Sequence, residues 1–196
     1  MNIQHFRLPS GARKERARKR PWHIVKAPPR PYAELRTASA FSFLDGASLP
    51  EDLIHTAAQK DIPAMALIDT NGVYGAPRFY GAAKKTGVRA IVGAEVVVDN
   101  DVRVKGLTLT RMDAARSNAR EMRLTLLVES HDGYRNLCKL LTAGALGRPK
   151  GEARFTWDLI AQHAGGLHCI TGGDEGPLVH ALRKGGITEA ETALHR

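Results

Sequence analysis

The pattern of apolar and polar positions in the first half of the chain predicts three strands separated by two helices. Residues 32–37 alternate between apolar and polar positions, which predicts a strand. Residues 62–68 form a continuous apolar run of strand length, typical of a strand buried on both faces of a parallel sheet. Residues 88–92 predict a third strand. A helix is expected to end near Lys60, and a second helix is expected over residues 76–85.

The first predicted helix has a start signal and an apolar face. Ser48 and Glu51 have the spacing of a capping box, and Pro50 falls in the first turn, where its missing N–H costs nothing. The apolar positions that share one face of this helix are Leu53, Ile54, Ala57 and Ala58. We therefore expect this helix to pack on the predicted sheet through that face.

The second half of the chain continues the same succession of elements. Strands are expected over residues 124–128 and 166–171, and residues 110–122 are polar without an apolar face, which predicts a surface excursion. Helices are expected over residues 133–141, 155–163 and 178–184. Strands followed by loops and helices in this order predict an α/β domain with a parallel sheet, either open or closed into a barrel.

The charge of the chain is concentrated at its amino terminus. The formal net charge is +9, and the first 31 residues contain nine of the 29 Lys and Arg residues but one of the 20 acidic residues. Pro28, Pro29 and Pro31 favour an extended linker at the end of this segment. We therefore expect residues 1–31 to be a basic, Pro-rich flexible arm and residues 32–196 to be the folded domain.

Two interpretations of the arm remain open. It could clamp the phosphate backbone of a nucleic acid without sequence preference, or it could be a solvated tail. The candidate nucleic-acid-binding residues are Arg13, Lys14, Arg16, Arg18, Lys19 and Arg20.

Composition excludes several classes of protein. No apolar run approaches the roughly 20 residues that a membrane span needs, and no apolar segment follows the basic amino terminus as in a secretory signal. Cys138 and Cys169 are far apart and match no CxxC pattern, so two reduced and buried thiols are expected. These features predict a cytoplasmic protein without a membrane partner.

The segment between Leu35 and Gly46 resembles the first motif of the PHP (polymerase and histidinol phosphatase) domain. The residues that match this motif are Leu35, Ser39, Ser42, Leu44, Asp45 and Gly46. Residues 64–75 resemble the second motif, and residues 82–95 resemble the third. The similarity continues through residues 133–141 and 166–173 and covers about residues 32–185. The chain therefore resembles the PHP domain of bacterial DNA polymerase III alpha-type polymerases, and its motifs are most similar to the error-prone branch.

This resemblance implies a distorted, TIM-like β/α barrel, here incomplete at its carboxyl terminus. Active members of the family hold a cluster of Zn, Mn or Mg ions at the carboxyl ends of the strands, where barrel enzymes place their chemistry. In those members, His, Asp, Glu and Cys side chains bind the metals, which activate water against a phosphoester.

The metal-binding pattern implied by the resemblance is mostly lost in this sequence. Two acidic positions are kept, while five other aligned positions carry residues that are not metal ligands. The aligned positions are Arg36, Ala38, Asp69, Thr70, Glu95, Arg123 and Gly173, of which Asp69 and Glu95 are the ones retained. We therefore expect a vestigial site without a metal cofactor or catalytic residues. We also hypothesise that Arg36 and Arg123 approach the two carboxyl groups and replace the metal with ion pairs.

The resemblance implies a domain with a structural role in an error-prone DNA polymerase, acting in replication or translesion repair synthesis. The carboxylates for nucleotidyl transfer are expected outside this chain. The implied partners are DNA, the remaining polymerase domains and accessory translesion subunits. Two alternatives remain: a stand-alone metal-dependent phosphoesterase or nuclease, and a basic DNA-binding module.

Overall fold

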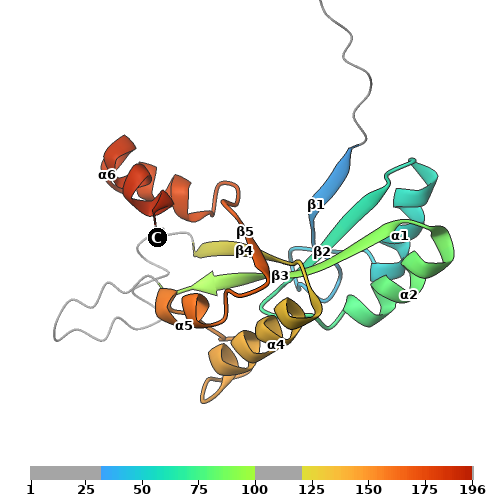
Figure 1. Cartoon of the computed structure of the whole chain (residues 1–196), viewed down its shortest axis with the longest axis horizontal. Coiled ribbons are helices and arrows are strands. Elements are labelled where there is room, and N and C mark those ends of the chain that lie inside the picture. The colour runs from blue at the N-terminus through green and yellow to red at the C-terminus, as the bar shows by residue number, and fades with distance from the viewer. Residues whose placement is uncertain (1–31, 100–120, 196) are drawn as a thin grey trace, which may run out of the picture. The chain divides into compact units, whose positions relative to one another are not determined.

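The computed structural model describes residues 32–99 and 121–195, which contain five strands and five helices (Figure 1). The chain divides into residues 1–30 and residues 31–196, and all described residues belong to the second unit. The strands are β1 (Ala33–Thr37), β2 (Ala64–Thr70), β3 (Arg89–Val98), β4 (Met122–Val128) and β5 (Leu167–Ile170). The helices are α1 (Pro50–Gln59), α2 (Ala76–Thr86), α4 (His131–Ala145), α5 (Trp157–Gln162) and α6 (Pro177–Leu194).

The five strands form one sheet in the order in which they occur along the chain, β1-β2-β3-β4-β5. This sequential order is that of a β/α barrel, whereas a doubly wound sheet reverses its order at a switch point. The expected α/β class with a barrel-type, incomplete sheet is confirmed. The predicted arm and most of the predicted polar excursion lie outside the described residues.

The expectation of an entirely parallel sheet is wrong for β4. β1, β2 and β3 pair in parallel, but β4 pairs antiparallel to both β3 and β5. A parallel neighbour requires a crossover, usually a helix, whereas an antiparallel neighbour does not. Residues 110–122 have no apolar face with which a crossover helix could pack on the sheet, which fits the antiparallel return.

Helices pack on one face of the sheet in two groups. Ile54 and Ala57 of α1 and Phe79 of α2 form a buried cluster with Met65 and Leu67 of β2. A second cluster joins α4 to β3 and β4, and its members include Val96, Leu124, Leu126, Leu137, Leu140 and Phe155. The predicted apolar face of the first helix is therefore confirmed.

Three local predictions differ from the structure. The helix α1 begins after Leu49, which makes no side-chain cap, so the predicted capping box at Ser48 is not formed. β3 continues to Val98 and β4 begins at Met122, because both strand ends are buried against the α4 cluster. Neither thiol is buried as expected, because Cys138 is partly buried and Cys169 is exposed. The helix expected over residues 178–184 is confirmed, since α6 has a kink at Gly185 and Gly186, where Gly186 adopts φ +71°.

The opposite face of the sheet has a small apolar core of Ala66, Ile68 and Leu127. Side chains alternate between the two faces of a strand, so Thr70 lies on this same face as Ile68. The register pairs Thr70 with Glu95, and Glu95 with Thr125. A polar layer therefore follows the small core along this face.

No helix among the described residues is long and apolar enough to cross a membrane.

Candidate functional site

A polar cavity of about 290 Å³ lies where β1 and β2 end. Its lining residues come from β1 to β4 and from the loops that follow β1 and β5. They are Arg36, Ala38, Asp45, Ile68, Thr70, Glu95, Arg123 and Glu175. The carboxyl ends of parallel strands are where barrel proteins place their functional groups, so this cavity is the candidate site.

Glu95 is the central acid of the cavity, and both of its carboxylate oxygens accept hydrogen bonds. Arg36 donates to Oε1 from Nε at 3.0 Å and from Nη2 at 2.7 Å. Arg123 donates from Nη1 to Oε2 at 3.4 Å. The Thr125 hydroxyl donates to Oε1 at 3.4 Å. The side chain of Glu95 is 9% exposed, so these guanidinium groups provide the counter-charge that a buried carboxylate needs.

Arg123 connects three parts of the domain that are distant in sequence. Its Nη1 lies 2.7 Å from Asp45 Oδ2, and its Nε lies 3.2 Å from Glu175 Oε2. Its backbone N–H donates to the carbonyl oxygen of Glu175 at 2.8 Å. Arg123 on β4 therefore connects the loop after β1, Glu95 within β3 and the loop after β5.

The pKa of Arg123 reflects two opposing effects. Burial lowers the pKa of the guanidinium, but the hydrogen bond to Asp45 and the charges of Asp45, Glu175 and Glu95 raise it. The second effect is larger, so the pKa lies above the ordinary value for arginine. Arg123 is therefore a permanent cation in this cavity.

Asp69 does not line the cavity, which corrects the expectation that it joins Glu95. It pairs with Ala94 in the sheet and lies on the helix-packed face, one position before Thr70. Its buried carboxyl group accepts hydrogen bonds from the Ser39 N–H at 2.8 Å and from the Ser39 and Ser42 hydroxyls at 2.9 Å. The second half of the ion-pair hypothesis is therefore wrong, because hydroxyl and amide groups, not guanidinium groups, satisfy Asp69.

The structure brings together five of the seven positions singled out from the sequence: Arg36, Ala38, Thr70, Glu95 and Arg123. Gly173 lies beside them, since a Cβ at this glycine would be 3.0 Å from Arg36 Nη1. Asp45 and Glu175 were not predicted as members of the site. Asp45 stands in the first motif, and Glu175 follows a glycine-rich turn, but the sequence carries no signal that pairs either with Arg123.

The cavity does not fit the metal cluster implied by the family. Within residues 32–99 and 121–195, no group of three or more His, Cys, Asp or Glu side chains is arranged to hold a metal ion. Two guanidinium groups stand at positions where ligands would be expected, and both oxygens of Glu95 already accept hydrogen bonds from them. A dication here would be repelled by two guanidinium groups.

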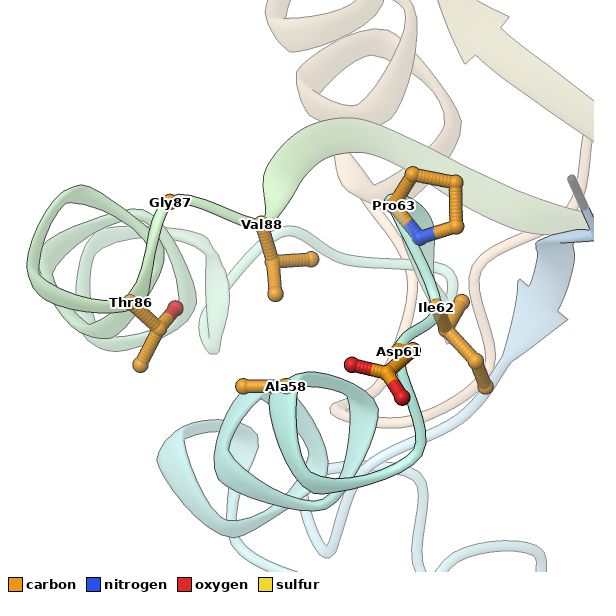
Figure 2. A pocket seen from close by; sticks show the side chains of 7 residues that line it. All are labelled: Ala58, Asp61, Ile62, Pro63, Thr86, Gly87 and Val88. Carbon is orange, nitrogen blue, oxygen red and sulfur yellow. The ribbon is translucent and has the colours of Figure 1, made fainter.

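A second hollow, of about 240 Å³, lies before the amino ends of β2 and β3 (Figure 2). Ala58, Ile62, Pro63, Gly87 and Val88 are among its seven lining residues, and Asp61 is the one ionisable residue of the seven. It lacks the convergent charged groups of the cavity at the other strand ends, so we do not assign it a chemical role.

Comparisons with known proteins agree with the motifs. The family described as "PHP domain" matches residues 34–196. An error-prone DNA polymerase of Mycolicibacterium paratuberculosis is 41% identical over 169 residues, covering 84% of this chain and 14% of the polymerase. An error-prone DNA polymerase of Anaeromyxobacter sp. strain K is 37% identical over 174 residues, with the same coverage of 84% and 14%. The chain thus spans about one seventh of the length of these relatives.

Among solved structures, an amidohydrolase from Chromobacterium violaceum is similar with a TM-score of 0.42 and 18% sequence identity. The similarity covers 84% of this chain and 54% of that protein.

The candidate nucleic-acid-binding residues of the arm lie outside the described residues.

Proposed function

Because this chain belongs to the PHP domain family, we propose that it is the N-terminal PHP domain of an error-prone alpha-type DNA polymerase, with a structural role. The similarity to error-prone polymerases at 33–41% identity supports this proposal. The nucleotidyl transfer of such a polymerase would be carried out by residues outside these 196. We further propose that the parent polymerase acts in replication or translesion repair synthesis in the cytoplasm, with DNA and accessory subunits as partners.

One observation carries the structural role: Arg36 and Arg123 occupy the cavity and neutralise Glu95. A metal centre links several loops through shared ligands. Here Arg123 makes comparable links through Asp45, Glu95 and Glu175, and a guanidinium with its five donors suits several carboxylates at once. The arginines thus supply cross-linking in this cavity without supplying an activated water.

A metal titration tests this proposal. The purified, metal-stripped chain is titrated with Mn²⁺ and with Zn²⁺ in a calorimeter, and its hydrolysis of a chromogenic phosphodiester is measured in parallel. We expect neither saturable binding in the cavity nor hydrolysis. Stoichiometric binding that is lost in Glu95→Gln would overturn the proposal and would favour a metal-dependent phosphoesterase.

A designed variant provides the matched positive control. Replacing Arg36, Ala38, Thr70 and Arg123 together with histidine would place imidazoles around Glu95 at the cavity-lining positions. We expect this variant to gain affinity for Zn²⁺ or Mn²⁺. A gain in this variant, with no binding by the natural chain, would identify the arginines as the groups that exclude the metal.

The proposal about the parent polymerase requires a separate measurement. An antibody raised against this domain would report the size of the native polypeptide in its source cells. We expect a product several times larger than the 21.3 kDa of this chain. A product of 21.3 kDa would contradict a polymerase domain and would favour the free-standing DNA-binding module.

A further inference from the structure

Two neighbouring apolar side chains project into solvent beside the cavity. Phe43 is 87% exposed and Leu44 is 105% exposed, which makes them the most exposed large apolar side chains in residues 32–99 and 121–195. They lie in the loop after β1, immediately before Asp45, which pairs with Arg123. Adjacent exposed apolar side chains on a folded domain mark an interaction site more often than isolated ones do.

The conformation of this loop is fixed by specific contacts. The N–H groups of Asp45 and Gly46 donate to the carbonyl oxygen of Ser42 at 3.0 and 2.9 Å. The Ser42 hydroxyl is itself buried and donates to Asp69. Gly46 packs so closely that a Cβ would lie 2.2 Å from the Ser39 carbonyl oxygen. The exposure of Phe43 and Leu44 therefore belongs to a defined turn.

Leu44 also has an unfavourable backbone conformation. Its φ is +72°, in the left-handed region. The other two non-glycine residues with positive φ in the described residues are Asp61 and Asn71, types that tolerate this region, whereas leucine does not. A glycine or asparagine would fit this turn better and would expose less apolar surface. Leu44 is fully exposed, so its side chain is not part of the buried core of the described residues, and strain of this kind is typical of functional segments.

We propose that Phe43 and Leu44 form a docking knob that inserts into an apolar pocket of another domain of the same longer polypeptide. This inference rests on the proposed function, because the polymerase relatives are about seven times longer than the matched region. Another domain of one polypeptide is present at high effective concentration, so a two-residue knob can be sufficient for docking. Arg123 holds Asp45 and so fixes the base of the knob.

The test compares the isolated domain with the native polypeptide. The double variant Phe43→Ser/Leu44→Asn is made in the 196-residue chain and in the chromosomal gene of the source cells. In the isolated chain we expect an unchanged or higher melting temperature, because asparagine relieves the left-handed strain. In the native polypeptide, followed in heated cells with an antibody against the domain, we expect the double variant to melt at a lower temperature than the natural protein.

Ile187→Gln is the matched control. Ile187 is 72% exposed on α6 and does not have a positive φ, so its replacement should change neither melting temperature. A lower melting temperature of the isolated double variant would show that the knob serves the domain's own fold and would overturn the proposal. An unchanged melting temperature in a longer native polypeptide would overturn the docking while leaving the proposed function intact.

Two further outcomes separate the remaining possibilities. A native product of 21.3 kDa would remove the proposed function and, with it, the docking partner. The binding of a fluorescent single-stranded oligonucleotide to the isolated chain is measured as well, because an exposed phenylalanine can stack on a base. Weaker oligonucleotide binding by the double variant, together with unchanged melting of the native polypeptide, would assign the knob to nucleic acid and overturn protein docking.

Discussion

Arg123 Nη1 lies 2.7 Å from Asp45 Oδ2, although the two residues are 78 positions apart in the sequence. The same guanidinium reaches Glu95 and Glu175, so its removal leaves three acids without their shared cation. We expect Arg123→Met to lower the free energy of unfolding by about 1–3 kcal/mol, because a partly buried network loses the cation that its three acids share. Urea denaturation of the purified chain measures this change.

The control for Arg123 is an exposed arginine with one acidic partner. Arg135 pairs with Asp132 on the surface of α4, three positions apart. Arg135→Met should change the free energy of unfolding by less than about 0.5 kcal/mol, since exposed ion pairs contribute little. Equal effects of the two substitutions would show that Arg123 does not act as a cross-link.

A second prediction concerns the buried carboxyl group of Asp69. Ser42 donates to Asp69 and accepts from the Thr70 N–H at 2.9 Å. Ser42→Ala removes both contacts, so we expect a loss of about 1–3 kcal/mol in the free energy of unfolding. Ser48→Ala is the control, because α1 has no side-chain cap and Ser48 is exposed. A large effect at Ser48 would instead indicate that the capping box forms in solution.

A third prediction concerns pH. Arg78 of α2 donates a hydrogen bond to the carboxylate of Glu51 in α1. This hydrogen bond lowers the pKa of Glu51. Because the folded-state pKa lies below the unfolded-state value, the ionised pair contributes stability above the unfolded-state pKa. That contribution is lost as the pH falls through the folded-state pKa. We expect an NMR titration to place the Glu51 midpoint below the usual glutamate range and Arg78→Met to move it upward. An unchanged midpoint in this variant would contradict the assigned cause.

A fourth prediction is that replacing two different glycines with alanine changes the stability of the domain in opposite directions. A Cβ at Gly46 would overlap the carbonyl oxygen of Ser39 at 2.2 Å, whereas a Cβ at Gly81 in α2 meets no atom within 4 Å. Gly46→Ala should therefore destabilise the domain by about 1–3 kcal/mol. Gly81→Ala should stabilise it by about 0.5–1 kcal/mol, because alanine favours the helix. Thermal denaturation of both variants under identical conditions compares them, and a tolerated alanine at position 46 would contradict the close packing of this loop.

The fifth prediction tests the basic arm. If all six candidate cations of residues 13–20 contact phosphates, the logarithm of the binding constant for duplex DNA should fall with the logarithm of salt concentration with a slope of about −5. Deletion of residues 1–31 should abolish this binding and its salt dependence. Lys150→Gln is the control, because it removes one positive charge from the folded domain and none from the arm. It should leave the slope unchanged. Equal binding by the truncated chain would show that the arm is a solvated tail.

Much of the fold could be predicted because the signals are local. The apolar run that became β2 and the amphipathic spacing of α1 each depend on neighbouring residues. The motif between Leu35 and Gly46 also indicated the family that the comparisons established. The antiparallel direction of β4 was not predictable in this way, because strand pairing is decided between segments that are distant in the sequence.

The sequence by itself determined the family, the succession of strands and helices, and the replacement of expected ligands by Arg36 and Arg123. The tertiary structure decided which groups these arginines contact. Asp69 and Glu95 are both retained acids, yet the pairing of Thr70 with Glu95 places Glu95 in the cavity and Asp69 on the opposite face. The physical reason is the two-residue alternation of a strand, in which the register against a neighbour decides the face that each side chain occupies.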